Sequence, residues 1–395
     1  MTSREMLPKA WDNSVSKSKP SEAYLKTLKQ RYHQATKKER SAILNEFVKT
    51  TGYHRKHAIA LLGGKRRHRT GAIRRPRGQI YTAEDRRAVR QLAEWFDYLG
   101  CKRLRGAMNT TWPDLRRQGH LRVSPESYDR LLKISPATMD RIRAADPEPG
   151  RGRRGLTKPG RLLKSQIPIR TFADWDVQRP GFVEIDLVDH SGGQASGEFA
   201  QTLTATDVLT GWTEMRAVRT KAQKFVFAAV QVIRSRLPTP LLGIDSDNGA
   251  EFINDPLRRY CAGEKITFTR GRVGRKNDNA FVEQKNWSVV RRLIGYDRYH
   301  SQRQVDQLNR LYDQWRLYVN FFLPVMKLVK KERVGSRVKK VYDEPQTPDA
   351  RLLASPDVSE ADQAKLRALY AKLDVVILKQ AIDDLLEALT PSRAG

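Results

Sequence analysis

The chain has 395 residues, with 74 Lys or Arg against 44 Asp or Glu, so its formal net charge is +30 and its pI is near 10.3. This length predicts two or three domains, and the excess of positive charge indicates a polyanionic partner, with nucleic acid as the first candidate. The lack of a long apolar run argues against a membrane protein, and the two cysteines, Cys101 and Cys261, exclude a disulfide framework and a multi-cysteine zinc site.

The N-terminal region is predicted to be helical from residue 21. Residues 1–20 are polar and lack the apolar core of a signal peptide, so we expect a mobile lead-in and a cytoplasmic protein. Apolar residues at helical spacing in 21–64 predict three helices, with a turn at Thr51-Gly52 before the third. The third helix is expected to bury Ala58, Ile59 and Leu62 and to expose His54, Arg55, Lys56 and His57.

These three helices resemble a helix-turn-helix DNA-binding domain, with Arg55 and Lys56 as candidate DNA contacts. A plain three-helix bundle with a solvated basic face is the alternative. Residues 65–81 follow as a basic arm or linker that contains Gly and Pro and no acidic residue. Such an arm can lie along phosphates or enter a minor groove. Its candidate DNA contacts are Arg66, Arg67, Arg69, Arg74, Arg75 and Arg77.

A second helical domain is predicted over residues 82–146. It begins with a capping-box sequence at Thr82, and Ser124-Pro125 and Ser135-Pro136 each place an N-cap before a proline. This domain either binds another part of a long DNA site or packs against the rest of the chain. Residues 147–174 are rich in Gly, Pro and Arg, and we interpret them as a basic linker that follows DNA.

Residues 175–300 have the pattern of an α/β domain. Strands are predicted at 182–188, 198–206 and 212–218, followed by a helix over 221–237. The inward residues of that helix are expected to be Phe225, Ala228, Ala229, Val232 and Ile233. A strand at 241–244 then leads into acidic residues. A helix over 255–262, a strand at 266–269 and a helix with Asp278 or Asn279 as its N-cap complete the domain.

Acidic residues are found on three of these elements. Asp186 lies inside the first strand, Asp247 follows the fourth, and Glu283 lies in the first turns of the last helix. A charge within a strand is costly to bury unless it is paired or bound to a metal. Three carboxylates with room for substrate phosphate suit Mg²⁺, and two such ions can act together in phosphoryl transfer.

Asp186, the SDNGAEF motif with Asp247 and the DNAFVEQ motif with Glu283 resemble the DDE triad of the retroviral integrase and bacterial insertion-sequence transposase superfamily. Thirty-five residues separate Asp247 from Glu283, which is the spacing typical of this branch. The resemblance implies a multidomain protein with an all-α helix-turn-helix region, a ribonuclease-H-like α/β integrase core and a basic, helical C-terminal region. It also implies that the three acids hold Mg²⁺, for which Mn²⁺ can substitute.

Other residues of the core have competing interpretations. Asp245 shares a strand face with Asp247 and is the main rival as a ligand, whereas Asp207 is expected to cap a turn and His190 to be packed. The basic, glycine-rich loop before Glu283 corresponds to a loop that approaches DNA in the family, so Arg275 and Lys276 are candidate contacts. Relatives often carry a basic residue seven positions after the glutamate. Here that residue is Val290, and Arg291 would point roughly 80° away from Glu283 in a regular helix.

The region 301–395 is predicted to be helical and basic. A long helical pattern runs through Trp315, the basic stretch 327–340 is compatible with a strand hairpin that meets DNA, and 359–389 is amphipathic. The chain is therefore interpreted as a DNA transposase that hydrolyses phosphodiester bonds at element ends and transfers strands. The alternatives are a ribonuclease-H-like nuclease that does not join strands and a domesticated DNA-binding regulator. The resemblance implies double-stranded DNA as partner, a homo-oligomer, a nucleoid-associated location in a bacterium, and an open question of a helper ATPase.

Overall fold

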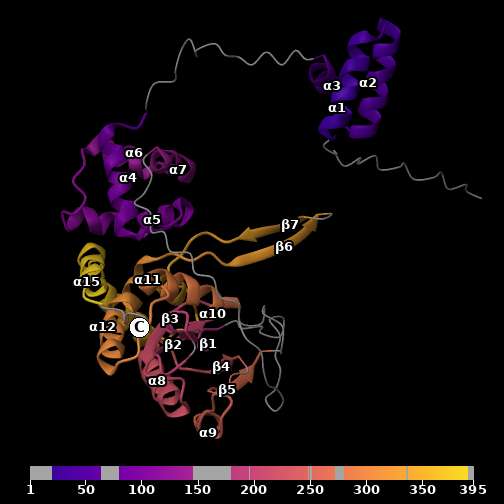
Figure 1. The fold of residues 1–395 in the computed structure, drawn as a ribbon. Helices are drawn as coiled ribbons and strands as arrows, with labels where there is room; N and C mark the ends of the chain where they lie inside the picture. The colour runs from indigo at the N-terminus through magenta and orange to yellow at the C-terminus, as the bar shows by residue number, and fades with distance from the viewer. Residues whose placement is uncertain are drawn as a thin grey trace, which may run out of the picture. The chain divides into compact units, whose positions relative to one another are not determined.

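The computed structural model describes residues 20–63, 80–145, 179–194, 196–247, 249, 251–271, 280–334 and 337–389. The contacts between residues divide the chain into one compact unit over residues 1–79 and another over residues 80–395. Figure 1 shows the helices and strands of both units. The predicted lead-in before residue 20, residues 65–79 of the basic arm and the whole 147–174 linker lie outside the described residues.

The described part of the first unit, residues 20–63, contains three helices around an aromatic core. They are α1 (Glu22–Gln34), α2 (Lys37–Thr51) and α3 (Arg55–Leu62), and their core is centred on the fully buried Phe47. Gly52 ends α2 with a φ of 67°, a conformation that suits glycine and turns the chain into α3. One expectation is wrong: Ile59 is 44% exposed, because Ala58 and Leu62, with the partly buried Leu61, fill the α3 side of this small core.

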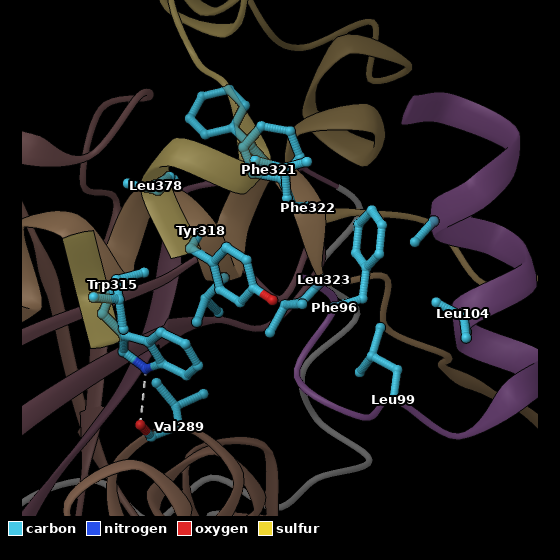
Figure 2. Packing of buried hydrophobic residues seen from close by; sticks show 14 of the residues in the cluster. Phe96, Leu99, Leu104, Val289, Trp315, Tyr318, Phe321, Phe322, Leu323 and Leu378 are labelled. Carbon is cyan, nitrogen blue, oxygen red and sulfur yellow. Dashed lines mark hydrogen bonds between the residues drawn. The ribbon is translucent and has the colours of Figure 1, made fainter. Parts of the chain in front are cut away.

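The second helical block consists of four helices, α4 (Ala83–Trp95), α5 (Cys101–Arg117), α6 (Pro125–Leu132) and α7 (Pro136–Ala144). The capping box at Thr82 is present, and Ser124 and Ser135 cap α6 and α7 before Pro125 and Pro136, as predicted. These helices share one apolar cluster with the C-terminal helices (Figure 2). Packing against the rest of the unit is thus observed for this block.

The centre of the second unit is a five-stranded mixed sheet in the order β3-β2-β1-β4-β5. Its strands are β1 (Phe182–Asp189), β2 (Gln201–Asp207), β3 (Thr213–Val218), β4 (Gly243–Ser246) and β5 (Thr267–Arg270). The first three form an antiparallel meander, and β4 and β5 continue the sheet in parallel to β1. The predicted strands and the mixed α/β character are confirmed.

Helices complete this domain. They are α8 (Gln223–Arg236), α9 (Asp255–Gly263) and a continuous helical run made of α10 (Ala280–Lys285), the π-helix η1 (Asn286–Arg291) and α11 (Arg292–Ile294). In α8 the predicted inward face needs a correction. Ala228 is exposed, whereas Val226 and Val230 are buried with Ala229 and Ile233. The larger side chains of Val226 and Val230 are thus buried in place of Ala228, which increases the buried apolar area.

The C-terminal region is anchored to the sheet by α12 (Gln302–Phe322). Asn309 and Asn320 exchange hydrogen bonds with the backbone of Ala217 and Thr213, so α12 satisfies the polar groups of the β3 edge. Arg316 forms an ion pair of 2.5 Å with the fully buried Glu214. The remaining elements are the hairpin of β6 (Leu328–Val334) and β7 (Arg337–Tyr342), and the helices α13 (Pro348–Leu353), α14 (Glu360–Tyr370) and α15 (Val375–Glu387).

The aromatic side of α12 joins the helical block to the domain. Tyr318 donates a hydrogen bond of 2.6 Å to the carbonyl oxygen of Trp95, and Trp315 donates one of 2.9 Å to the carbonyl oxygen of Val289 (Figure 2). Val289 belongs to the helical run that carries Glu283, so α12 also holds that run in place. Across the described ranges, no helix combines the length and apolar character that a membrane crossing requires.

Candidate active site

Two of the predicted acids lie side by side on the sheet. β1 and β4 are parallel neighbours, and their register pairs Glu184 with Asp245 and Ile185 with Ser246. The next residues of the chain are Asp186, within β1, and Asp247, which directly follows β4. Because neighbouring strands are about 4.8 Å apart, continuing this register by one residue would put Asp186 and Asp247 next to each other on one face of the sheet.

Asp247 is held in a partly buried environment at the end of β4. Its Oδ1 accepts a hydrogen bond of 2.9 Å from the backbone N–H of Gly249. Burial raises the pKa of Asp247, and the Gly249 hydrogen bond lowers it by less. A carboxylate whose ionised form is disfavoured by burial gains from a nearby cation, so this environment suits a metal ligand.

Two hydrogen bonds attach the Glu283 helix to β1 on this same face. Val282 donates its backbone N–H to Oε2 of Glu184 at 2.9 Å, and Asn286 donates its side-chain amide to Oδ2 of Asp186 at 2.6 Å. Glu283 lies between these two attachment points in the chain. Its backbone is therefore placed over the acidic face, although its side chain is not among those that the structure describes.

Asn286 has a second role in orienting Asp186. Its Oδ1 accepts a hydrogen bond of 2.5 Å from the hydroxyl of Thr204, and the same hydroxyl lies 3.2 Å from the carbonyl oxygen of Asp186. Thr204 is the β2 residue directly opposite Asp186. Thr204 of β2 thus holds the Asn286 amide, and the Asn286 amide in turn holds the Asp186 carboxylate of β1. The sequence analysis missed Asn286, although its distance of one helical turn from Glu283 was a usable signal.

The π-helix changes the expected direction of Arg291. Arg291 is the last residue of the π-helix η1, in which each residue turns the chain by less than the ~100° of an α-helix. The angle of roughly 80° expected for Arg291 in a regular helix therefore does not apply. Its guanidinium lies over the ring of Tyr296 at 4.6 Å, and burial lowers its pKa.

The other acids of the core have structural partners. Asp245 is 2% exposed and accepts a hydrogen bond of 2.6 Å from Thr269, which places it deeper than Asp247. Glu184 is also buried and receives the Val282 N–H described above. Asp207 accepts hydrogen bonds from Gly181 and Thr210, as expected of a turn cap. Burial raises the pKa of Asp207 despite these donors.

His190 is packed, as expected. Its ring is fully buried, and Nε2 lies 2.7 Å from the hydroxyl of Thr202, which in turn lies 2.8 Å from that of Tyr312. Burial, aided by the positive charge of Arg291, lowers the pKa of His190 to about 3. The ring is therefore neutral across the physiological range and belongs to a structural network.

Three cationic side chains, which are buried or partly buried, lie at the Glu283 helix: Lys285, Arg103 and Lys327. Lys285 is 9% exposed, and burial together with Arg103 and Lys327 lowers its pKa to about 7. Burial lowers the pKa of Lys327 to about 8, although Asp207 opposes this shift, and Lys327 donates to the carbonyl oxygen of Val208. These residues come from α5, α10 and the segment before β6, so they tie the site to its surroundings.

The candidate DNA contacts are only partly described. In α3, Arg55 and Lys56 are exposed, and Arg55 donates hydrogen bonds to Asn45 and Ser41 of α2. The other candidates lie outside the described residues; they are Arg66, Arg67, Arg69, Arg74, Arg75, Arg77, Arg275 and Lys276. Trp287, which the sequence analysis treated only as part of an apolar pattern, is 60% exposed one turn after Glu283.

The donor set fits a hard divalent cation. Asp186 in β1 and Asp247 directly after β4 offer carboxylate oxygens, and the helix that carries Glu283 is attached to Asp186 through Asn286. Among the residues with described side chains, no group of three or more His, Cys, Asp or Glu residues is arranged to hold a metal. Two adjacent carboxylates agree with the preference of Mg²⁺ for a few protein oxygens and retained water.

Comparison with known proteins identifies a family. No protein-family model matches the chain. The chain is 42% identical over 330 residues to uncharacterized protein y4rM of Sinorhizobium fredii (strain NBRC 101917 / NGR234). The aligned region covers 82% of this chain and 92% of the relative. This protein belongs to the y4rM family. The match includes most of the y4rM chain, so members of the family share the greater part of their length.

Solved structures similar to this y4rM-family chain are retroviral integrase catalytic cores. The HTLV-2 integrase core in complex with magnesium has a TM-score of 0.29 and 15% identity, and it covers 37% of this chain and 90% of that one. The core of BIV integrase has a TM-score of 0.29 and 17% identity, with coverage of 42% and 90%. At these TM-scores the likeness does not by itself assign an activity to the y4rM-family chain.

Proposed function

We propose that this protein is a DNA transposase of the DDE type, which hydrolyses phosphodiester bonds at the ends of a DNA element and joins the freed 3′ ends to target DNA. The observation that carries the proposal is the parallel β1–β4 register, which pairs the residues just before Asp186 and Asp247 and supports these two acids as neighbouring ligands, together with the Asn286–Asp186 hydrogen bond from the Glu283 helix. The mixed strand order of the sheet and the net charge of +30 agree with the proposal.

Asp186, Asp247 and Glu283 would hold divalent cations, with Mg²⁺ preferred and Mn²⁺ able to substitute. When bound, such ions activate the attacking oxygen and stabilise the charge on the leaving oxygen. The chain's own contribution is preorganisation. Asn286 and Thr204 orient Asp186, Gly249 orients Asp247, and Glu184 holds the start of the helix that carries Glu283.

DNA contacts complete the proposal. Arg55 and Lys56 of α3 would read or grip the element end, and the arginines of 65–81 would follow its phosphates. Arg275, Lys276 and Arg291 would contact DNA near the scissile phosphate. Trp287 would stack on an unpaired base at that end, because an exposed indole next to the acids offers a flat apolar surface. Pairing of two element ends implies at least a dimer.

Substitution of Asp247 tests the activity directly. With Mg²⁺ and DNA carrying the element ends, the wild-type protein is expected to cleave and to join pre-cleaved ends to a target duplex. Asp247→Asn should abolish both reactions and still bind the ends, because it removes a ligand without changing the shape. Cleavage without joining by the wild-type protein would favour the ribonuclease-H-like nuclease, and binding without metal-dependent turnover would favour the regulator.

A further inference from the structure

The β6–β7 hairpin is a separate two-stranded sheet that pairs with no other described strand. Figure 1 shows it extending from the body of the second unit. Its strands are seven and six residues long, so the ribbon reaches roughly 20 Å at ~3.3 Å per residue. An isolated two-stranded hairpin is at best marginally stable in water, and a bound partner would compensate for that.

The hairpin is strongly basic. Residues 328–342 contain six Lys or Arg and one Glu, and the described side chains of Lys330, Arg333, Lys339 and Lys340 are exposed. The single acid, Glu332, forms an ion pair of 2.5 Å with Lys330. Lys339 and Lys340 are neighbours in β7 and belong to opposite faces by strand alternation, so both faces of the ribbon carry positive charge.

The base of the hairpin is fixed to the catalytic domain. Lys327 and Asp343 flank the two strands and exchange hydrogen bonds. The N–H of Asp343 donates to the carbonyl oxygen of Lys327 at 2.9 Å, and the N–H of Lys327 donates to the Asp343 carboxylate. Arg351 forms an ion pair of 2.7 Å with Asp343, and the Lys327 ammonium donates to Val208 at the end of β2. The N–H of Val208 donates a hydrogen bond of 2.9 Å to the carbonyl oxygen of Phe182, the first residue of β1. The ribbon thus starts beside the strand that carries Asp186.

We infer that the β6–β7 ribbon inserts into the major groove of the DNA duplex whose end lies at Asp186 and Asp247. The inference rests on the proposed function and deepens it by naming the groove and the element that contacts it. The major groove of B-form DNA is wide enough for a two-stranded β-ribbon, and lysines on both faces can reach the phosphates of both walls. Because the base of the ribbon is fixed, the ribbon sets the distance between the bound duplex and the acids Asp186 and Asp247.

Binding of a short random-sequence DNA duplex tests the inference. Measurements in EDTA at several salt concentrations exclude cleavage. Lys339→Ala/Lys340→Ala should weaken binding by ~10-fold or more and make the log–log salt slope shallower by about 2, since each phosphate contact contributes ~0.9. The matched control Lys365→Ala/Lys372→Ala removes two exposed lysines from the α14 region and should leave both values unchanged. Lys339→Arg/Lys340→Arg should retain wild-type binding, which shows that the hairpin tolerates substitution.

Methylation of guanine N7 identifies the groove. It should weaken binding of the wild-type protein and have much less effect on Lys339→Ala/Lys340→Ala, because N7 lies in the major groove. An unchanged salt slope in the hairpin variant, an equal loss in the α14 control, or insensitivity to N7 methylation would each overturn the inference. Failure of the proposed function gives a different result: the wild-type protein would bind DNA through the hairpin yet neither cleave nor join it with Mg²⁺.

Discussion

Asn286 donates a hydrogen bond of 2.6 Å to Asp186, and this bond joins the helix that carries Glu283 to the central strand of the sheet. The donor is itself held by Thr204, so the orientation of Asp186 depends on three elements at once. If Asp186 is a metal ligand as proposed, this arrangement orients its carboxylate before the cation binds. The affinity of the metal site should therefore respond to residues that never touch the metal.

Asn286→Leu should raise the Mg²⁺ concentration that DNA cleavage requires. Without the amide donor the Asp186 carboxylate loses its orientation, and we expect a ~10–100-fold rise in the Mg²⁺ concentration needed for half-maximal cleavage, as is usual for residues that orient ligands. Thr204→Val should give a smaller rise, because it removes only the support of Asn286. Titration of cleavage with Mg²⁺ measures both. A lower melting temperature with an unchanged Mg²⁺ requirement would show that Asn286 is only structural.

Asp245 and Asp247 provide a matched pair. Asp247→Asn should stabilise the metal-free protein near neutral pH, because burial raises the folded pKa of Asp247 and disfavours its charged form. The gain should disappear in acid, below the unfolded pKa of 3.8, where the wild-type carboxyl is neutral in both states. Asp245→Asn should instead lower stability by ~1–3 kcal/mol, because it disturbs the buried bond with Thr269.

Thermal unfolding with and without Mg²⁺ separates these two acids. Mg²⁺ should raise the melting temperature of the wild-type protein and of Asp245→Asn, and it should have no effect on Asp247→Asn. The assignment of Asp247 as the ligand would fail if Mg²⁺ stabilised Asp247→Asn and not Asp245→Asn.

Lys285 makes stability depend on pH. Its pKa falls from 10.5 to about 7 on folding, so between these values the unfolded chain binds more protons and stability rises with pH. Lys285→Met should be more stable than wild type at pH 7, by a few kcal/mol at ~1.4 kcal/mol per pKa unit, and its stability should rise less with pH. Urea unfolding from pH 7 to just below the usual thiol pKa of 9.0 measures this, since Cys101 and Cys261 act in the opposite direction above it.

The Glu214–Arg316 pair should be a major source of stability for the α12 attachment. Glu214 is fully buried and also accepts a hydrogen bond of 2.8 Å from Trp212, so Arg316→Ala leaves a buried charge without its counter-ion. We expect a loss of about 3–5 kcal/mol in the free energy of unfolding. The exposed Arg258–Asp255 pair serves as control, and Arg258→Ala should cost less than about 1 kcal/mol. Equal losses in urea unfolding would contradict the assigned role of burial.

Trp287 should matter for DNA and not for folding. Because its side chain is 60% exposed, Trp287→Ala should change stability by less than about 0.5 kcal/mol. Binding to duplexes with unpaired ends should weaken by ~1–3 kcal/mol, whereas binding to blunt, fully paired duplexes should change little. Trp287→Phe should retain part of the preference for unpaired ends. A uniform loss for both kinds of DNA would argue against stacking.

Local patterns predicted much of the fold and part of the site. Alternating and helical spacing located the five strands and the α8 and α9 helices, and the Ser-Pro pairs located the starts of α6 and α7. These features depend on near neighbours in the chain, which the sequence displays directly. The exposure of Ile59 and Ala228 was predicted wrongly, because helical periodicity marks a broad face and the packed partner decides which residues in it are covered.

The sequence by itself determined that Asp186 lies in a strand, that Asp247 follows one and that Glu283 lies in the first turns of a helix, since strand, turn and helix signals are local. Only the tertiary structure decided that β1 and β4 are parallel neighbours whose register pairs Ile185 with Ser246, the residues before Asp186 and Asp247. It alone revealed that Asn286 reaches Asp186 and that Arg291 lies in a π-helix. Contacts between residues 61 and 100 positions apart depend on how elements pack together, and packing is a property of the whole chain.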